Sequence, residues 1–89
     1  MVSGNILIET ENGLHIKPAG SISSIALKYS CSAYMKVRNY YVNAKSVLGI
    51  LSAQVKQGET VEFVCDGEEE DKCLEEILDF ISKHNRGEK

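Results

Sequence analysis

The sequence predicts a single α+β domain over residues 1–89, with the element order βαββαβα. Three observations predict this class. A chain of 89 residues has room for one hydrophobic core. Apolar residues alternate with more polar ones in 33–38 and 60–65, as they do in half-buried strands. They recur at helical spacing in 18–29 and 68–86, as they do in helices that pack on a sheet.

The first strand and the first helix are predicted from apolar residues and from the positions of glycine and proline. Residues 6–9 form a short apolar run that leads into a turn ending at Gly13, so they predict a strand. A helix is expected to begin near residues 15–17. Pro18 suits its first turn, because the N–H that proline lacks would be unpaired there.

A hairpin and a short helix are expected next. Strands at 33–38 and 40–42 flank Asn39, a residue that tolerates turn conformations. Ser46 precedes the apolar run 47–51, and a serine hydroxyl at that position caps the free N–H groups of a helix.

The last strand and the last helix complete the predicted order. Residues 60–65 alternate between two faces, and 68–86 begin with three acidic residues and carry an apolar stripe. Lys83 and Arg86 stand near the end of this helix, where cations complement the helix dipole, and Gly87 is a stop signal.

Composition and charge exclude several classes of protein. Ten Lys and Arg residues against thirteen Asp and Glu residues give a net charge of −3, which argues against direct nucleic-acid binding. The N-terminus has no basic segment, and no apolar stretch is long enough to cross a bilayer. We therefore expect a cytoplasmic protein that does not insert into membranes.

The cysteine pattern also favours a cytoplasmic protein. Cys31, Cys65 and Cys73 are odd in number and contain no C-x-x-C spacing, which argues against a disulfide framework and a zinc site. A reducing compartment is the simpler interpretation. Cys65 lies on the apolar face of its predicted strand, so we expect it in the core, and no metal site is predicted.

The segment 12–18 is the strongest candidate for chemistry, because it places His15 in a glycine-containing loop directly before a helix. An exposed or capping imidazole is the structural alternative. However, a phosphoryl group on His15 would meet the free N–H groups of the helix, and Lys17 would neutralise part of its charge. An imidazole nitrogen is also a nucleophile that can accept a phosphoryl group and pass it on.

Ser46 and the apolar residues after it are the second candidate. A helix cap is sufficient to explain Ser46, but phosphorylation there would also be compatible with the fold, since negative charge suits a helix N-terminus. Val47, Leu48 and Leu51 can form one apolar cluster, while Ile50 points elsewhere. The sequence is compatible with two alternatives for this cluster: it is an exposed docking surface, or it is completely buried under a loop.

The chain resembles the HPr family, the histidine-containing phosphocarriers of the bacterial phosphotransferase system. Residues 13–15 (Gly-Leu-His) followed by Pro18 and Ala19, and then residues 45–47 (Lys-Ser-Val), carry the resemblance, which covers essentially the whole chain. It implies an open-faced β-sandwich, in which three helices cover one face of a four-stranded antiparallel sheet with strand order 1-4-2-3.

The resemblance also implies a function. His15 would accept a phosphoryl group on Nδ1 from phosphorylated enzyme I, with phosphoenolpyruvate as the ultimate donor, and pass it to IIA domains of sugar permeases. Ser46 matches the serine that HPr kinase/phosphorylase modifies, and the partner-binding positions of the family match Gly20, Ser24, Val47, Leu48 and Leu51. Such a protein is a monomeric carrier without a cofactor and not a free-standing enzyme.

Two residues beside His15 depart from the family pattern. Ile16 stands where a small residue is usual, and Lys17 stands where arginine is usual. Lysine keeps the positive charge but lacks the planar fork with which arginine binds phosphate. The alternative function is a regulatory module, whose Ser46-phosphorylated form binds a catabolite-control transcription factor. His84 is assigned no role beyond the charge complementarity of its helix end.

Overall fold

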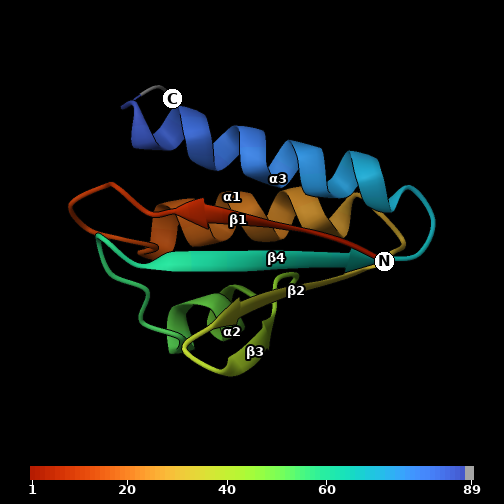
Figure 1. Ribbon diagram of the computed structural model, residues 1–89, viewed down its shortest axis with the longest axis horizontal. Coiled ribbons are helices and arrows are strands. Elements are labelled where there is room, and N and C mark those ends of the chain that lie inside the picture. The colour runs from red at the N-terminus through yellow and green to blue at the C-terminus, as the bar shows by residue number, and fades with distance from the viewer. Residues whose placement is uncertain (88–89) are drawn as a thin grey trace.

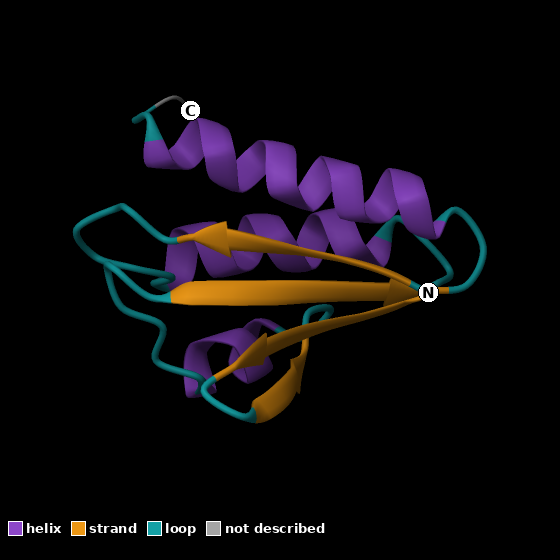
Figure 2. Ribbon diagram, in the orientation of Figure 1, coloured by secondary structure: helices purple, strands orange, loops and turns teal. Residues whose placement is uncertain are grey.

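Four antiparallel strands form one sheet in the order β1-β4-β2-β3 in the computed structural model, which describes residues 1–87 (Figure 1). The strands are β1 (Val2–Leu7), β2 (Ser32–Val37), β3 (Tyr40–Asn43) and β4 (Thr60–Asp66). The helices are α1 (Ile16–Leu27), α2 (Val47–Ser52) and α3 (Glu70–Asn85), and they lie on one side of the sheet (Figure 2). The predicted open-faced sandwich is therefore confirmed. Positions 88–89 of the predicted domain lie outside the described residues.

The core lies between the sheet and the three helices. Alternate residues of the two central strands point into it and are buried: Ala33, Met35 and Val37 of β2, and Val61, Phe63 and Cys65 of β4. Buried helix residues meet them from the other side, among them Ala19, Ile22, Ala26, Ile50, Cys73, Ile77 and Ile81. The period of two in the strands and the longer period in the helices therefore bury one continuous apolar layer.

The first strand differs from the expected range of 6–9. It begins four residues earlier, at Val2, and ends at Leu7. Gly4 takes one of its inward positions, where a Cβ atom would lie 2.8 Å from Cδ1 of Leu78 in α3. Helix α3 therefore packs closely on β1 at this glycine, with the end of the Leu78 side chain over it. A glycine in place of an apolar side chain hides the alternation in the sequence.

Other element ends shift by smaller amounts. The hairpin turn uses both Arg38 (φ 47°) and Asn39 (φ 78°), the left-handed pair that a two-residue hairpin loop requires. Helix α1 ends at Leu27 instead of residue 29. Helix α3 begins at Glu70 instead of residue 68, because Glu69 (φ 59°) is left-handed.

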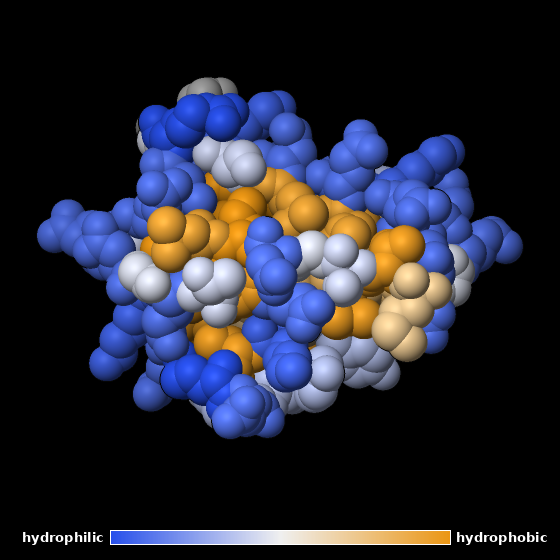
Figure 3. Space-filling model, in the orientation of Figure 1, coloured by the Kyte–Doolittle hydropathy of each residue, from blue (hydrophilic) through white to orange (hydrophobic). Residues whose placement is uncertain are grey.

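The other face of the sheet carries no helix within residues 1–87 and shows apolar side chains among polar ones (Figure 3). Leu7, Tyr34 and Tyr41 are among its exposed side chains. None of the helices described combines the length and the apolar character that a membrane crossing requires.

Candidate functional site

His15 lies where the loop after β1 becomes helix α1. It is the N-cap residue, with an extended backbone (φ −79°, ψ −169°), and its carbonyl accepts a hydrogen bond from the N–H of Ala19 at 3.0 Å. The side chain of His15 is half-buried, and those of Ile16 and Lys17 are exposed. The backbone under the imidazole is therefore held by the helix, while the ring can be reached from solvent.

The loop that carries His15 is attached to the segment before β4. The N–H of Leu14 donates to the carbonyl of Val55 at 3.1 Å, and the side chain of Leu14 is buried. Gly13 has φ 62°, and a Cβ atom there would lie 2.9 Å from Cα of Lys56 and would overlap the Val55 carbonyl oxygen. Glycine is thus needed both for its left-handed backbone and for this close approach.

The start of α1 suits an anion. Within residues 1–87 no side chain caps this helix end, and its first turn holds no acidic residue. The first N–H groups of a helix have no intrahelical partner, and the helix dipole adds partial positive charge there. A negative group attached to His15 would therefore meet the backbone N–H groups of α1 and the cation of Lys17.

A surface hollow of about 500 Å³ opens beside His15. Its lining comes from the loop after β1, the start of α1 and the end of α3, and includes Glu11, Asn12, His15, Lys17, Phe80 and His84. The structure thus brings His15 and Lys17 together, as the sequence predicts. Ser46 and the apolar residues of α2 are not among the lining residues.

His84 is the residue that the sequence did not point to. Its ring centroid lies 6.4 Å from that of His15, although the two residues are near opposite ends of the chain. Burial, and secondarily the charge of His15, lower the pKa of His84. The two histidines meet because α3 packs along β1, and β1 leads into the loop that carries His15. This arrangement follows from the tertiary fold, so no local sequence pattern indicates it.

Ser46 is the N-cap of α2, as expected. Its Oγ accepts a hydrogen bond from the N–H of Gly49 at 2.9 Å, and its own N–H donates to the carbonyl of Asn43 at 3.1 Å. The side chain is half-buried. A hydroxyl that is partly exposed at a helix N-terminus can carry a negative modification without opposing the helix dipole.

The apolar residues of α2 divide between surface and core. Leu48 is 79% exposed, Val47 and Leu51 are half-buried, and Ile50 is fully buried. An exposed leucine flanked by two half-buried apolar side chains offers a small contact surface. The structure therefore favours an accessible cluster over complete burial under a loop.

Gly20 and Ser24 lie on helix α1, which packs against α2. A Cβ atom on Gly20 would meet nothing within 4 Å, so the helix backbone is open to close approach there. Ser24 is exposed, one turn further along. Both positions are thus compatible with the partner-facing role implied by the resemblance.

The three cysteines converge in the core. They are free and buried, and their Sγ atoms all lie within 4.8 Å of one another, close enough for one soft metal ion. Burial raises the pKa of both Cys65 and Cys73, which favours neutral thiols over the thiolates that bind metal. This chemistry favours an apolar packing role for the three side chains, and the core position predicted for Cys65 is confirmed.

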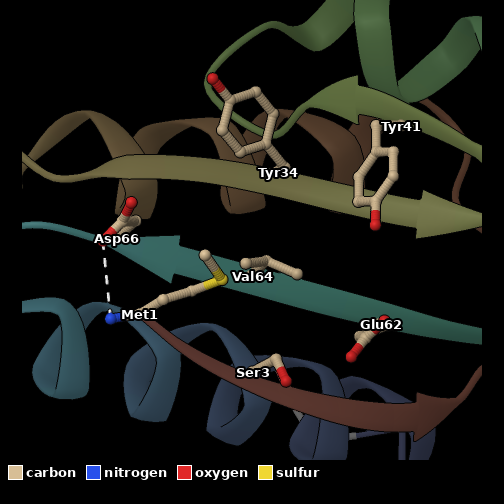
Figure 4. Close-up of a pocket in the computed structure, with 7 residues that line it drawn as sticks. All are labelled: Met1, Ser3, Tyr34, Tyr41, Glu62, Val64 and Asp66. Carbon is tan, nitrogen blue, oxygen red and sulfur yellow. Dashed lines mark ion pairs between the residues drawn. The ribbon is translucent and has the colours of Figure 1, made fainter.

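A second hollow of about 410 Å³ lies on the uncovered face of the sheet, away from His15 (Figure 4). Tyr34 and Tyr41 stand over it, and the N-terminal amine pairs with Asp66 at 3.5 Å. Its walls are mainly apolar, and they contain neither histidine nor lysine. The hollow beside His15 has the better chemistry for an anion.

Comparison with known proteins agrees with the fold. A family profile described as the PTS HPr component phosphorylation site matches residues 2–83, a range that includes His15 and Ser46. HPr-like protein Crh of Halalkalibacterium halodurans is 26% identical over 83 residues, which are 93% of this chain and 99% of that protein. Crh of Bacillus subtilis is also 26% identical, over 93% of this chain and 98% of its own length.

Solved structures show the same likeness. HPr-C-His from Thermoanaerobacter tengcongensis has a TM-score of 0.92 and 34% identity, covering 100% of this chain and 99% of its own. Crh of Bacillus subtilis, described as a dimer with a swapped domain, has a TM-score of 0.74 and 26% identity, covering 93% of this chain and 95% of its own. The similarity thus extends over the whole described fold.

Proposed function

This chain belongs to the HPr family, and we propose that it is a phosphocarrier that holds a phosphoryl group on Nδ1 of His15. The observation that carries the proposal is the position of His15 at an uncapped helix start, beside an open hollow that also contains Lys17. An imidazole nitrogen attacks phosphorus and forms a high-energy N–P bond. The helix N–H groups and Lys17 would stabilise the negative charge.

The donor in this proposal is phosphorylated enzyme I, and phosphoenolpyruvate is the ultimate source. The bond that holds the phosphoryl group on enzyme I breaks as the N–P bond to His15 forms, and the group then leaves His15 for a IIA domain of a sugar permease. The protein is a carrier and not a free-standing catalyst. It needs no cofactor and acts as a monomer in the cytoplasm.

The partner surface of the proposal lies on α1 and α2. Gly20 and Ser24 permit close approach to α1, and Val47, Leu48 and Leu51 supply apolar contact. Phosphorylation of Ser46 by HPr kinase/phosphorylase would place about two negative charges beside this cluster. The fold would remain, but the surface offered to partners would change.

The second candidate function is regulatory, and the two curated relatives compared above support it, since each is an HPr-like protein Crh. In this case the Ser46-phosphorylated form binds a catabolite-control transcription factor, and His15 has little importance. The accessible cap hydroxyl of Ser46 next to exposed Leu48 supports this candidate.

The test of carriage is the intact mass of the protein after incubation with phosphoenolpyruvate and enzyme I. We expect one acid-labile phosphoryl adduct on the wild type and none on His15→Ala. Enzyme I must be shown to be active on another carrier in parallel. No adduct under those conditions would contradict phosphocarriage.

A binding measurement separates the regulatory function. Binding of the kinase-treated protein to the transcription factor that persists in His15→Ala and is lost in Ser46→Ala would support the regulatory candidate. Equal binding by the unmodified protein would contradict it.

A further inference from the structure

Two histidine rings share the hollow beside the start of α1. His15 stands at one edge, and His84, in the last turn of α3, has its ring centroid 6.4 Å away at an interplanar angle of 46°. Phe80 lies one turn before His84 on the same helix face and stacks on its ring at 5.7 Å and 16°. The imidazole of His84 is thus held by an aromatic neighbour at the rim of the site.

One ring nitrogen of His84 has no partner. Nε2 is buried, and it is the one buried side-chain nitrogen or oxygen within residues 1–87 that lacks a hydrogen bond. Such an atom costs free energy in an unliganded structure, and in native proteins it often marks a functional site. His84 lines the hollow, so an oxygen-rich group placed there would be an acceptor for a ring nitrogen of His84 that carries a proton.

The distance between the two rings suits a phosphoryl group. A phosphoryl group on His15 projects its oxygens beyond the ring nitrogen, and a charge-assisted N–H···O bond then spans about 2.7–2.9 Å. The 6.4 Å between ring centroids leaves room for one such oxygen between the imidazoles. Direct contact between the two rings is not needed.

The surroundings of His84 disfavour its protonated form in the unmodified protein. Burial, and secondarily His15, lower the pKa of His84 in the unmodified protein. From the facing elements, Glu11 and Lys17 line the same hollow. On α3 itself, Lys83 pairs with Asp79 at 3.1 Å, and Arg86 follows at the helix end. A phosphoryl group would place about two negative charges on His15, and their attraction for a protonated imidazole would raise the pKa of His84.

We propose that His84 is a second histidine of the phosphoryl site, and that its ring N–H donates a hydrogen bond to an oxygen of the phosphoryl group on His15. The proposal rests on the phosphocarrier function. His84 forms no covalent bond: the bond between phosphorus and the donor breaks, the N–P bond to His15 forms, and the proton that His84 takes up comes from solvent.

The test measures the pKa of His84 by NMR, from the chemical shifts of its ring C–H groups, before and after phosphorylation. Phosphoramidate is used as a chemical donor in addition to enzyme I, and mass mapping verifies that His15 carries the group. We expect the pKa of His84 to rise by at least about one unit, a tenfold change in proton affinity. An unchanged or lower pKa would overturn the proposal, as would modification of His84 in place of His15.

Two variants of His84 distinguish a direct interaction with the phosphoryl group from a purely structural role, through the pH dependence of the ³¹P chemical shift. His84→Phe keeps a ring on Phe80 without nitrogen, and His84→Gln keeps an N–H donor that does not titrate. The ³¹P shift of phosphorylated His15 reports the ionisation of the phosphoryl group itself in every variant. In the wild type it should show a second inflection, at the pKa that the ring C–H shifts give for His84, and in either variant this second inflection should be absent. A second inflection retained in both variants would overturn the proposal, and His84→Gln decides if His84→Phe fails to fold.

The two proposals fail in different ways. If phosphoramidate modifies His15 but enzyme I does not, phosphocarriage is contradicted while the NMR titration still decides the role of His84. If both donors work but His84 does not respond, only the inference about His84 is lost.

Discussion

At the residue scale, Gly13 determines where His15 stands. Its φ of 62° and the lack of space for a Cβ atom next to Val55 and Lys56 both exclude a side chain. We expect Gly13→Ala to lower the free energy of unfolding by about 2 kcal/mol or more, since it combines a left-handed alanine with a backbone clash. Urea unfolding followed by circular dichroism measures the change.

Gly20→Ala is the matched control for this prediction. The added Cβ atom meets nothing within 4 Å, and alanine is the better helix former, so the variant should be as stable as the wild type or up to about 1 kcal/mol more stable. Equal loss of stability in both variants would show that close packing at Gly13 is not the cause.

The residues of the site could be predicted from the sequence only where the chemistry is local. His15, Lys17 and the cap residue Ser46 stand next to the helix starts that give them meaning, so the order of residues is sufficient. His84 meets His15 only after α3 has packed along β1, and nothing near residue 84 in the sequence records that contact.

At the element scale, the contact between α1 and α3 is reinforced by a hydrogen bond that can be titrated. The hydroxyl of Tyr29, just after α1, donates to Oε1 of Glu76 in α3 at 2.6 Å, and Lys28 pairs with the same carboxylate. The bond to Glu76, more than burial, raises the pKa of Tyr29 to about 12. Lys28, and then Tyr29, lower the pKa of Glu76.

The sign of each shift fixes its effect on stability. The protonated phenol of Tyr29 stabilises the folded state fully below the pKa of about 10 that it has in the unfolded chain. This stabilisation is lost as the pH rises toward about 12, the pKa in the folded protein. The ionised carboxylate of Glu76 stabilises the folded state fully above the ordinary pKa of a glutamate. This stabilisation is lost as the pH falls through the lowered pKa that Glu76 has in the folded protein.

A spectroscopic pH titration tests the hydrogen bond between Tyr29 and Glu76. One of the four tyrosines should ionise near pH 12 in the wild type, and in Glu76→Gln it should ionise near its ordinary value of about 10. Glu75→Gln removes a neighbouring exposed carboxylate and should leave the titration of Tyr29 unchanged. A late-ionising tyrosine that persists in Glu76→Gln would contradict the assignment.

The elements themselves could be predicted better than their ends. Regular periodicity marked β2, β4 and the helices, because their inward positions hold apolar side chains. The start of β1 was missed since Gly4 occupies an inward position there, and the start of α3 was displaced by the left-handed Glu69. Both exceptions arise from contacts or turns that periodicity does not record.

At the scale of the whole molecule, the cysteines show what only the complete fold determines. Cys31 directly precedes β2, Cys65 lies near the end of β4 and Cys73 near the start of α3, and their Sγ atoms lie within 4.8 Å of one another. Their spacing in the sequence argues against a disulfide framework, and all three are free in this structure. It could not indicate the cluster, because the sheet order and the packing of α3 create it.

The reactivity of this cluster reports on opening of the whole core. The three thiols are nearly inaccessible, and burial holds the pKa of Cys65 and Cys73 above the ordinary range, so little thiolate is available to react. We expect a thiol reagent to label the native protein at a rate set by unfolding, and urea should accelerate labelling in step with the loss of helical signal. Ser30→Cys is the control, because residue 30 is exposed beside Cys31 and its thiol should react at once. If the native thiols reacted as fast as this added thiol, the sheet and α3 would have to separate locally without unfolding of the molecule, and the cluster could not belong to the cooperative core.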